Sequence, residues 1–101
     1  MFVFDDVMLL DDRAIQMVLR DVDQKDIVLA LKGASDQVKS KILKNMSQRA
    51  RQMVLEDMEV MGPVRLKNSE EAQQKIVNVI RRLEETGEIT VARGGEAEVF
   101  V

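Results

Sequence analysis

Residues 68–87 read NSEEAQQKIVNVIRRLEETG and carry the longest helical pattern in the chain. The apolar residues of this stretch recur every three or four positions, at Ala72, Ile76, Val79, Ile80 and Leu83. Such spacing places them on one face of a helix. Asn68 and Glu71 have the spacing of a capping box, and Gly87 is positioned to end the helix. We therefore predict a long amphipathic helix whose apolar face must be covered by other elements.

Four shorter helical patterns precede this one, and the helices they predict could cover its apolar face. Their apolar residues are Ala14, Ile15, Val18, Leu19 and Val22 in the first, Ile27, Val28, Ala30 and Leu31 in the second, Val38, Ile42 and Met46 in the third, and Ala50, Val54 and Met61 in the fourth. Helices this short are marginal in isolation and gain stability by burying their apolar faces together. The patterns predict an all-α domain in which no helix folds alone.

Polar and glycine residues mark the ends of these helices. N-terminal caps are expected at Asp11 or Asp12, Asp23, Ser35 and Ser47, whose side chains accept from free first-turn N–H groups. Gly33 suits the position after the second helix, where a left-handed backbone favours glycine. The third helix is expected to run to about Met46, and the fourth to stop at Gly62-Pro63.

The predicted fold is a compact all-α bundle or superhelix of about five to six short helices, similar to armadillo repeats. Residues 88–101, EITVARGGEAEVFV, change character, since β-branched residues flank Gly94-Gly95. Two alternatives stay open for this segment: a short C-terminal hairpin, or an extended and disordered tail.

The composition excludes several classes of function. The chain has 101 residues, one domain's worth, with a net charge of −3 and neither His nor Cys. Imidazole catalysis, thiolate chemistry and most zinc sites are thereby excluded, and we expect no enzyme activity, no cofactor and no metal. The negative charge and the lack of Trp and Tyr disfavour nucleic-acid binding. No apolar run reaches the roughly 18 residues of a membrane span, and the acidic opening MFVFDDVMLLDD does not resemble a signal peptide.

Residues 47–65, SQRARQMVLEDMEVMGPVR, place charges of both signs on the fourth helix. Arg49 and Glu56 are seven positions apart and therefore share a line along the helix. Asp57 lies roughly 80° round from Arg49. The sequence leaves two interpretations open: an ordinary solvated face, or a surface that a partner recognises.

The opening residues MFVF are a second anomaly. Met1, Phe2, Val3 and Phe4 are four consecutive large apolar side chains, and two of them are among only three Phe in the chain. They either dock on the domain's own core or pack against a neighbouring element that this chain lacks.

Six motifs, taken together, resemble a known family. They are MFVF at 1–4, LDDRAIQ at 10–16, LALKGAS at 29–35, KNMSQRA at 44–50, GPVRL at 62–66 and RRLEETGEI at 81–89. In this order they resemble the C-terminal domain of FliG, the bacterial flagellar motor switch protein. The resemblance spans nearly the whole chain but only the C-terminal part of the family's full-length proteins.

The resemblance implies a helical torque domain at the cytoplasmic face of the inner membrane, in the flagellar basal body. It implies contact with the cytoplasmic loop of the stator protein MotA through Lys32, Arg49, Glu56, Asp57 and Arg65. Glu56 stands where the family often has Asp, and Leu55 where a charged residue can occur.

The resemblance further implies that MFVF is a hinge about which the domain turns when rotation reverses. The chain would then divide into a hinge segment with a short helix at 1–10, the torque domain at 11–87 and a tail at 88–101. Neighbouring FliG subunits and the switch protein FliM are implied partners. An alternative is a non-enzymatic helical scaffold that binds FliM through its hydrophobic face. Exposure of the charged row favours the first interpretation, and its burial in internal pairs favours the second.

Overall fold

A computed structural model describes residues 3–91, and this part of the chain is helical. It contains a 3-10 helix η1 (Phe4–Leu9) and five α-helices, α1 (Asp12–Arg20), α2 (Gln24–Lys32), α3 (Asp36–Leu43), α4 (Gln48–Met61) and α5 (Leu66–Glu85). No strand occurs between residues 3 and 91. The predicted all-α class with five to six short helices is confirmed.

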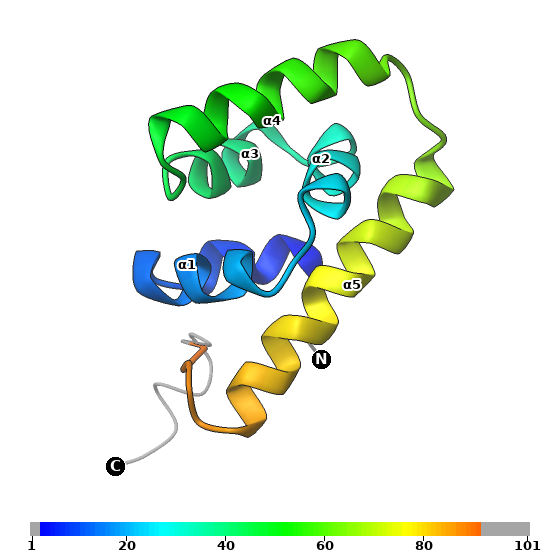
Figure 1. The fold of residues 1–101 in the computed structure, drawn as a ribbon. Helices are drawn as coiled ribbons and strands as arrows, with labels where there is room; N and C mark the ends of the chain where they lie inside the picture. Colours follow the sequence, from blue (N-terminus) through cyan, green and yellow to red (C-terminus); the bar gives the residue numbers. More distant parts are fainter. Residues whose placement is uncertain (1–2, 92–101) are drawn as a thin grey trace.

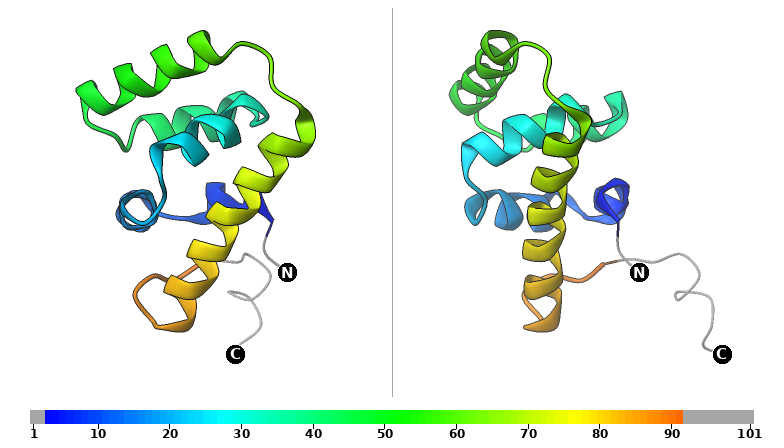
Figure 2. Two further views of the ribbon diagram at one scale, coloured as in Figure 1. Left: turned by 45° about the vertical axis from the view of Figure 1, so that its right-hand side comes forward. Right: turned by 90° about the vertical axis from the view of Figure 1, so that its right-hand side faces the viewer.

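The longest helix, α5, organises the arrangement of the others. It runs diagonally across the molecule, and α2 packs most extensively against it, with α1 and η1 as smaller neighbours (Figure 1). Helix α4 lies at the opposite end from the C-terminal end of α5 and packs mainly on α2 (Figure 2). Helices α1, α4 and η1 are thus joined to the rest through α2 and α5, whereas α3 packs mainly on η1.

The hydrophobic core draws on every helix. The largest fully buried apolar side chains are Leu10, Ile15, Leu31, Ile80, Val28, Val38, Val54 and Val77. Most were expected to face inward from their helical spacing. Helix α4 contributes only Val54 as a fully buried residue, although it is 14 residues long. It is therefore a surface helix fixed along a single narrow line.

Three of the predicted N-terminal caps are present. The Asp11 carboxylate accepts from the Ala14 N–H at 2.8 Å, in the capping geometry that satisfies a free first-turn donor. The hydroxyls of Ser35 and Ser47 do the same for α3 and α4, at 3.2 Å and 3.1 Å. At the other end of α4, Gly62 takes a left-handed φ of 66°, which explains the stop at this residue.

Two helix boundaries differ from those predicted. Helix α3 ends at Leu43 rather than near Met46, because the Asn45 side chain donates to the Lys41 carbonyl at 2.8 Å and the chain tightens into a turn. Helix α5 begins at Leu66, before the capping box that was predicted further along.

The two ends of α2 also differ from expectation. Asp23 precedes the helix, but its side chain makes no capping hydrogen bond. Gly33 follows the helix with φ at −105°, so the predicted left-handed conformation is wrong. Glycine is needed here for space instead, because a Cβ on Gly33 would lie 2.5 Å from the Ser69 Oγ of α5. Ser69 is itself buried, and its hydroxyl donates to the Leu29 carbonyl of α2 at 2.7 Å.

Beyond α5, the chain turns back onto the core. Gly87 has a φ of 80°, as its predicted role at the helix end requires. Ile89 and Val91 are buried in the core. The predicted hairpin at Gly94-Gly95 lies outside the described residues.

Candidate functional site

The outer face of α4 carries the charged row. Val54 and its half-buried neighbours Met58 and Met61 attach the helix to α2, which leaves the opposite side to solvent. Arg49 and Glu56 both lie on that exposed side. Seven residues of helix separate them by about 10 Å along the axis. The row predicted from the sequence is therefore present and faces outward.

Within the described part of the chain, neither end of this row is neutralised internally. Arg49 takes part in no ion pair or hydrogen bond there, and the four salt bridges all involve other residues. Glu56 has a single polar neighbour, the Gln52 amide, whose nitrogen donates to it at 3.3 Å. Both charges are thus available to a partner.

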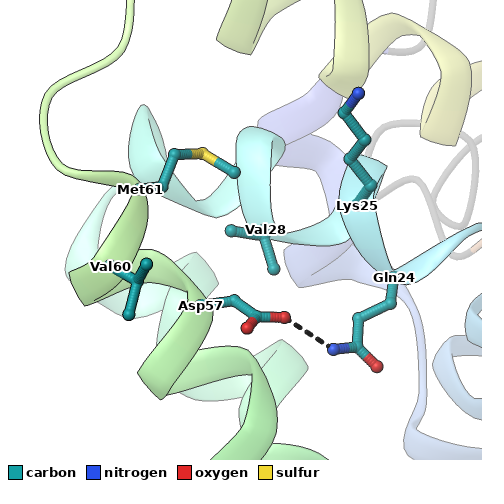
Figure 3. Close-up of a pocket in the computed structure, with 6 residues that line it drawn as sticks. All are labelled: Gln24, Lys25, Val28, Asp57, Val60 and Met61. Carbon is teal, nitrogen blue, oxygen red and sulfur yellow. Dashed lines mark hydrogen bonds between the residues drawn. The ribbon is translucent and has the colours of Figure 1, made fainter.

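Asp57 points along a different flank of α4, toward the start of α2. Its carboxylate accepts from the Gln24 Nε2 at 2.8 Å (Figure 3). The two residues border an open hollow of about 320 Å³ between α2 and α4. Asp57 is exposed, so a partner is able to reach it while the bond to Gln24 fixes its direction. The sequence did not indicate Gln24, which lies 33 residues away.

Lys32 lies behind α4 rather than on its outer face. It is half-buried at the end of α2, and its ammonium group donates to the Met58 carbonyl at 3.2 Å. This bond ties the last turn of α2 to the C-terminal half of α4. The structure therefore does not bring Lys32 into line with Arg49 and Glu56.

We expect Lys32→Met to lower the free energy of unfolding by about 1 kcal/mol, since methionine retains the apolar stem but not the charged donor. Urea unfolding followed by circular dichroism measures the difference. Lys25→Met is the matched control, because Lys25 is exposed on the same helix and makes no bond within residues 3–91. Equal stabilities of the two variants would show that the Met58 contact contributes nothing.

Arg65 is the most distant member of the predicted set. It precedes the first residue of α5 and is exposed, in the connection that follows Gly62. Arg49 is in the first turn of α4, whereas Arg65 follows its last residue, so the two arginines lie at opposite ends of that helix. The fold brings together Arg49, Glu56 and, on the adjacent flank, Asp57, while Arg65 and Lys32 stand apart.

The opening segment has two kinds of residue. Phe4 is buried in η1 and belongs to the domain's own core, whereas Val3 is 52% exposed. Met1 and Phe2 lie outside the described residues. For Phe4, packing on its own core is the interpretation that the structure supports.

Residues 3–91 contain neither a metal-binding cluster nor a membrane-spanning helix. No three carboxylates there come close enough to hold a metal ion. None of the helices in this range has the length and apolar character needed to cross a membrane. The prominent surface feature that remains is α4 with its row of charges.

Comparison with known proteins gives one consistent family. The sequence profile described as the FliG C-terminal domain matches residues 1–91. The flagellar motor switch protein FliG of Thermotoga maritima is 63% identical over all 101 residues, and that of Bacillus subtilis is 55% identical. In both cases the whole chain aligns with 30% of the relative, so it spans about a third of the length of these proteins.

Solved structures agree with this relationship. A crystallised FliG fragment from H. pylori superposes with a TM-score of 0.88 at 39% identity, over 91% of this chain and 40% of that one. Full-length FliG from Aquifex aeolicus superposes with a TM-score of 0.83 at 45% identity, over 86% of this chain and 27% of that one.

Proposed function

Because this chain belongs to the FliG C-terminal domain family, we propose that it is the part of a flagellar rotor that contacts the stator and receives torque. The contact surface is the outer face of α4, and the partner is the cytoplasmic loop of the stator protein MotA. The observation that carries the proposal is the exposure of Arg49 and Glu56 along one line, without an ion pair in the described residues.

Weak charges suit a contact that forms and releases at each step. An exposed ion pair contributes only about 0–1 kcal/mol, and salt screens it within roughly 8–10 Å. Complementary charges therefore guide two surfaces into alignment more than they hold them together. The row is positive at Arg49 and negative at Glu56 and Asp57. A partner with complementary charges is therefore favoured in only one orientation along α4.

Lys32 and Arg65 complete the proposed stator-contact set. Arg65 extends the charged surface past the C-terminal end of α4, where its side chain is exposed. Lys32 contributes its charge from beneath the helix, where the Met58 carbonyl fixes its ammonium group. The energy for rotation comes from ion flow through the stator, and this domain transmits the force.

The direction of rotation is proposed to depend on the hinge Met1–Phe4. Turning residues 11–87 about this segment reverses the direction in which the α4 row faces the stator, which is a hinge motion of the kind used in other switches. Phe4, Val7 and Leu10 are buried in one core with the helices of residues 11–87, so η1 would turn together with them. Residues 88–101 are the proposed tail, of which Ile89 and Val91 pack on the core.

The domain is proposed to act at the cytoplasmic face of the inner membrane, beside neighbouring FliG subunits and the switch protein FliM. An alternative function is a scaffold that binds FliM through a hydrophobic face. Met8 and Leu9 of η1 favour this second candidate, since they are 41% and 39% exposed.

Exchanging the two charges of the row tests the proposal. We expect Arg49→Glu combined with Glu56→Arg to weaken stator binding by roughly ten- to hundredfold, because two attractions become repulsions. In the full-length switch protein of the source bacterium, swimming in soft agar should fail. Far-UV circular dichroism and the melting temperature should stay unchanged, since both side chains are exposed.

The control is a matched exchange of exposed charges away from both α4 and the hinge, Arg20→Glu with Glu85→Arg. The two residues are exposed at the C-terminal ends of α1 and α5. This variant should swim normally. Normal swimming by the α4 variant as well would rule out the charged row as the torque surface.

A further inference from the structure

An apolar line runs between the charges on the outer face of α4. Met53 and Val60 are seven positions apart, so they share a line beside that of Arg49 and Glu56. Their side chains are 44% and 87% exposed. Single exposed aliphatic side chains are normal on a protein surface. These two share one line, however, and Val60 adjoins the apolar residues Val28 and Met61 of the hollow, which makes a continuous patch of the kind that a partner buries.

Val60 also stands at the edge of the hollow between α2 and α4. Val28 and Met61 supply the apolar part of the hollow, while Asp57 borders it and the Lys25 side chain extends away from that carboxylate (Figure 3). The apolar line therefore has a recess at its C-terminal end. An aliphatic side chain inserted there would contact Val60 and Met61 together.

We propose that Met53 and Val60 form the apolar centre of the stator contact, and that the stator presents a helix with two aliphatic side chains about seven residues apart. Charge complementarity sets the direction of this helix. An acidic side chain belongs opposite Arg49, and a basic one belongs opposite Glu56 and Asp57. The second aliphatic side chain then fills the hollow beside Val60. This inference rests on the proposed function.

The reason for an apolar centre is quantitative. An exposed ion pair changes a binding constant by about one- to fivefold. Fully burying one valine or methionine side chain changes it by roughly ten- to hundredfold. Burial of Met53 and Val60 accordingly supplies most of the affinity, and the charges supply alignment. Affinity and salt dependence should therefore respond to different substitutions.

Binding of this chain to purified stator complexes in detergent tests the inference. We expect Val60→Asn to weaken binding about tenfold, with the dependence of the binding constant on salt unchanged. Folding should be unaffected, because Val60 is 87% exposed and asparagine has a similar helix propensity. Leu55→Asn is the matched control, since Leu55 is 47% exposed on another flank of the same helix and should bind as the unmodified chain does.

The possible outcomes are distinguishable. If the charge exchange at Arg49 and Glu56 weakens binding but Val60→Asn does not, the inference is wrong and the proposed function stands. If the unmodified chain binds no stator complex, both are wrong. If sedimentation shows that the chain pairs with itself and that Val60→Asn abolishes pairing, the occupant is a second copy and the inference is overturned.

Discussion

Ile80→Ala is expected to lower the free energy of unfolding by about 3–5 kcal/mol, the range for truncating a large aliphatic side chain in a tight core. Ile80 has no exposed surface. It lines a small apolar cavity together with side chains from η1 to α3, among them Val7, Leu10, Ile15, Val18, Ile27 and Ile42. The space enclosed among these residues is only about 10 Å³. Truncation to alanine would therefore create a new cavity, and because its walls are apolar, this cavity would not hold water.

Chemical denaturation monitored by circular dichroism measures this loss. A domain of this size has a total stability of about 5–15 kcal/mol, so the variant is close to unfolding. Ile80→Val keeps the test informative if the alanine variant does not fold, with an expected loss of about 0.5–1.5 kcal/mol. Leu66→Ala, at a residue 66% exposed on the same helix, should change stability little. Similar losses at the two positions would contradict the assignment of Ile80 to the centre of the core.

Gly33→Ala is expected to destabilise the domain by about 1–3 kcal/mol through a steric clash between helices. The backbone at Gly33 is ordinary, with φ at −105°, so alanine meets no conformational barrier there. Its Cβ would lie 2.5 Å from the Ser69 Oγ and 3.1 Å from the Ser69 Cβ. The Ser69 hydroxyl has little freedom to move, because it donates to the Leu29 carbonyl at 2.7 Å.

A double-mutant cycle with Ser69→Ala separates the two possible roles of this glycine. Ser69→Ala alone should cost about 1 kcal/mol, because the Leu29 carbonyl loses its partner at the end of α2. If the clash is the cause, the double variant should be more stable than the sum of the single losses predicts, since the hydroxyl is absent. Strict additivity would indicate that Gly33 acts through its backbone alone, as the sequence pattern had suggested.

The periodic pattern of apolar residues correctly predicted which side chains of a helix face the core and which face solvent. Val54 and Ile80 were placed inward by their spacing, and both are buried. Arg49 and Glu56 were placed on one outer line by the same reasoning, and both are exposed. Ser35 and Ser47 cap their helices as expected, because the donor lies only three residues along the chain. Each of these features depends on one helix and its immediate neighbours.

The end of α3 was misjudged because of the local bond from Asn45 to Lys41, but the other contacts that were missed join separate helices. Lys32 reaches Met58 across 26 residues, and Gln24 reaches Asp57 across 33. The close approach of Gly33 to Ser69 joins α2 to α5 in the same way.

The sequence by itself therefore determined the helices, their inward faces and the outward charged row, because the geometry of a single helix fixes which way each side chain points. Only the tertiary structure decided that Lys32 and Asp57, among the predicted site residues, are bonded to neighbouring helices, and why position 33 must be glycine. Those outcomes depend on where two helices cross, and the spacing of residues within either helix contains no information about the crossing.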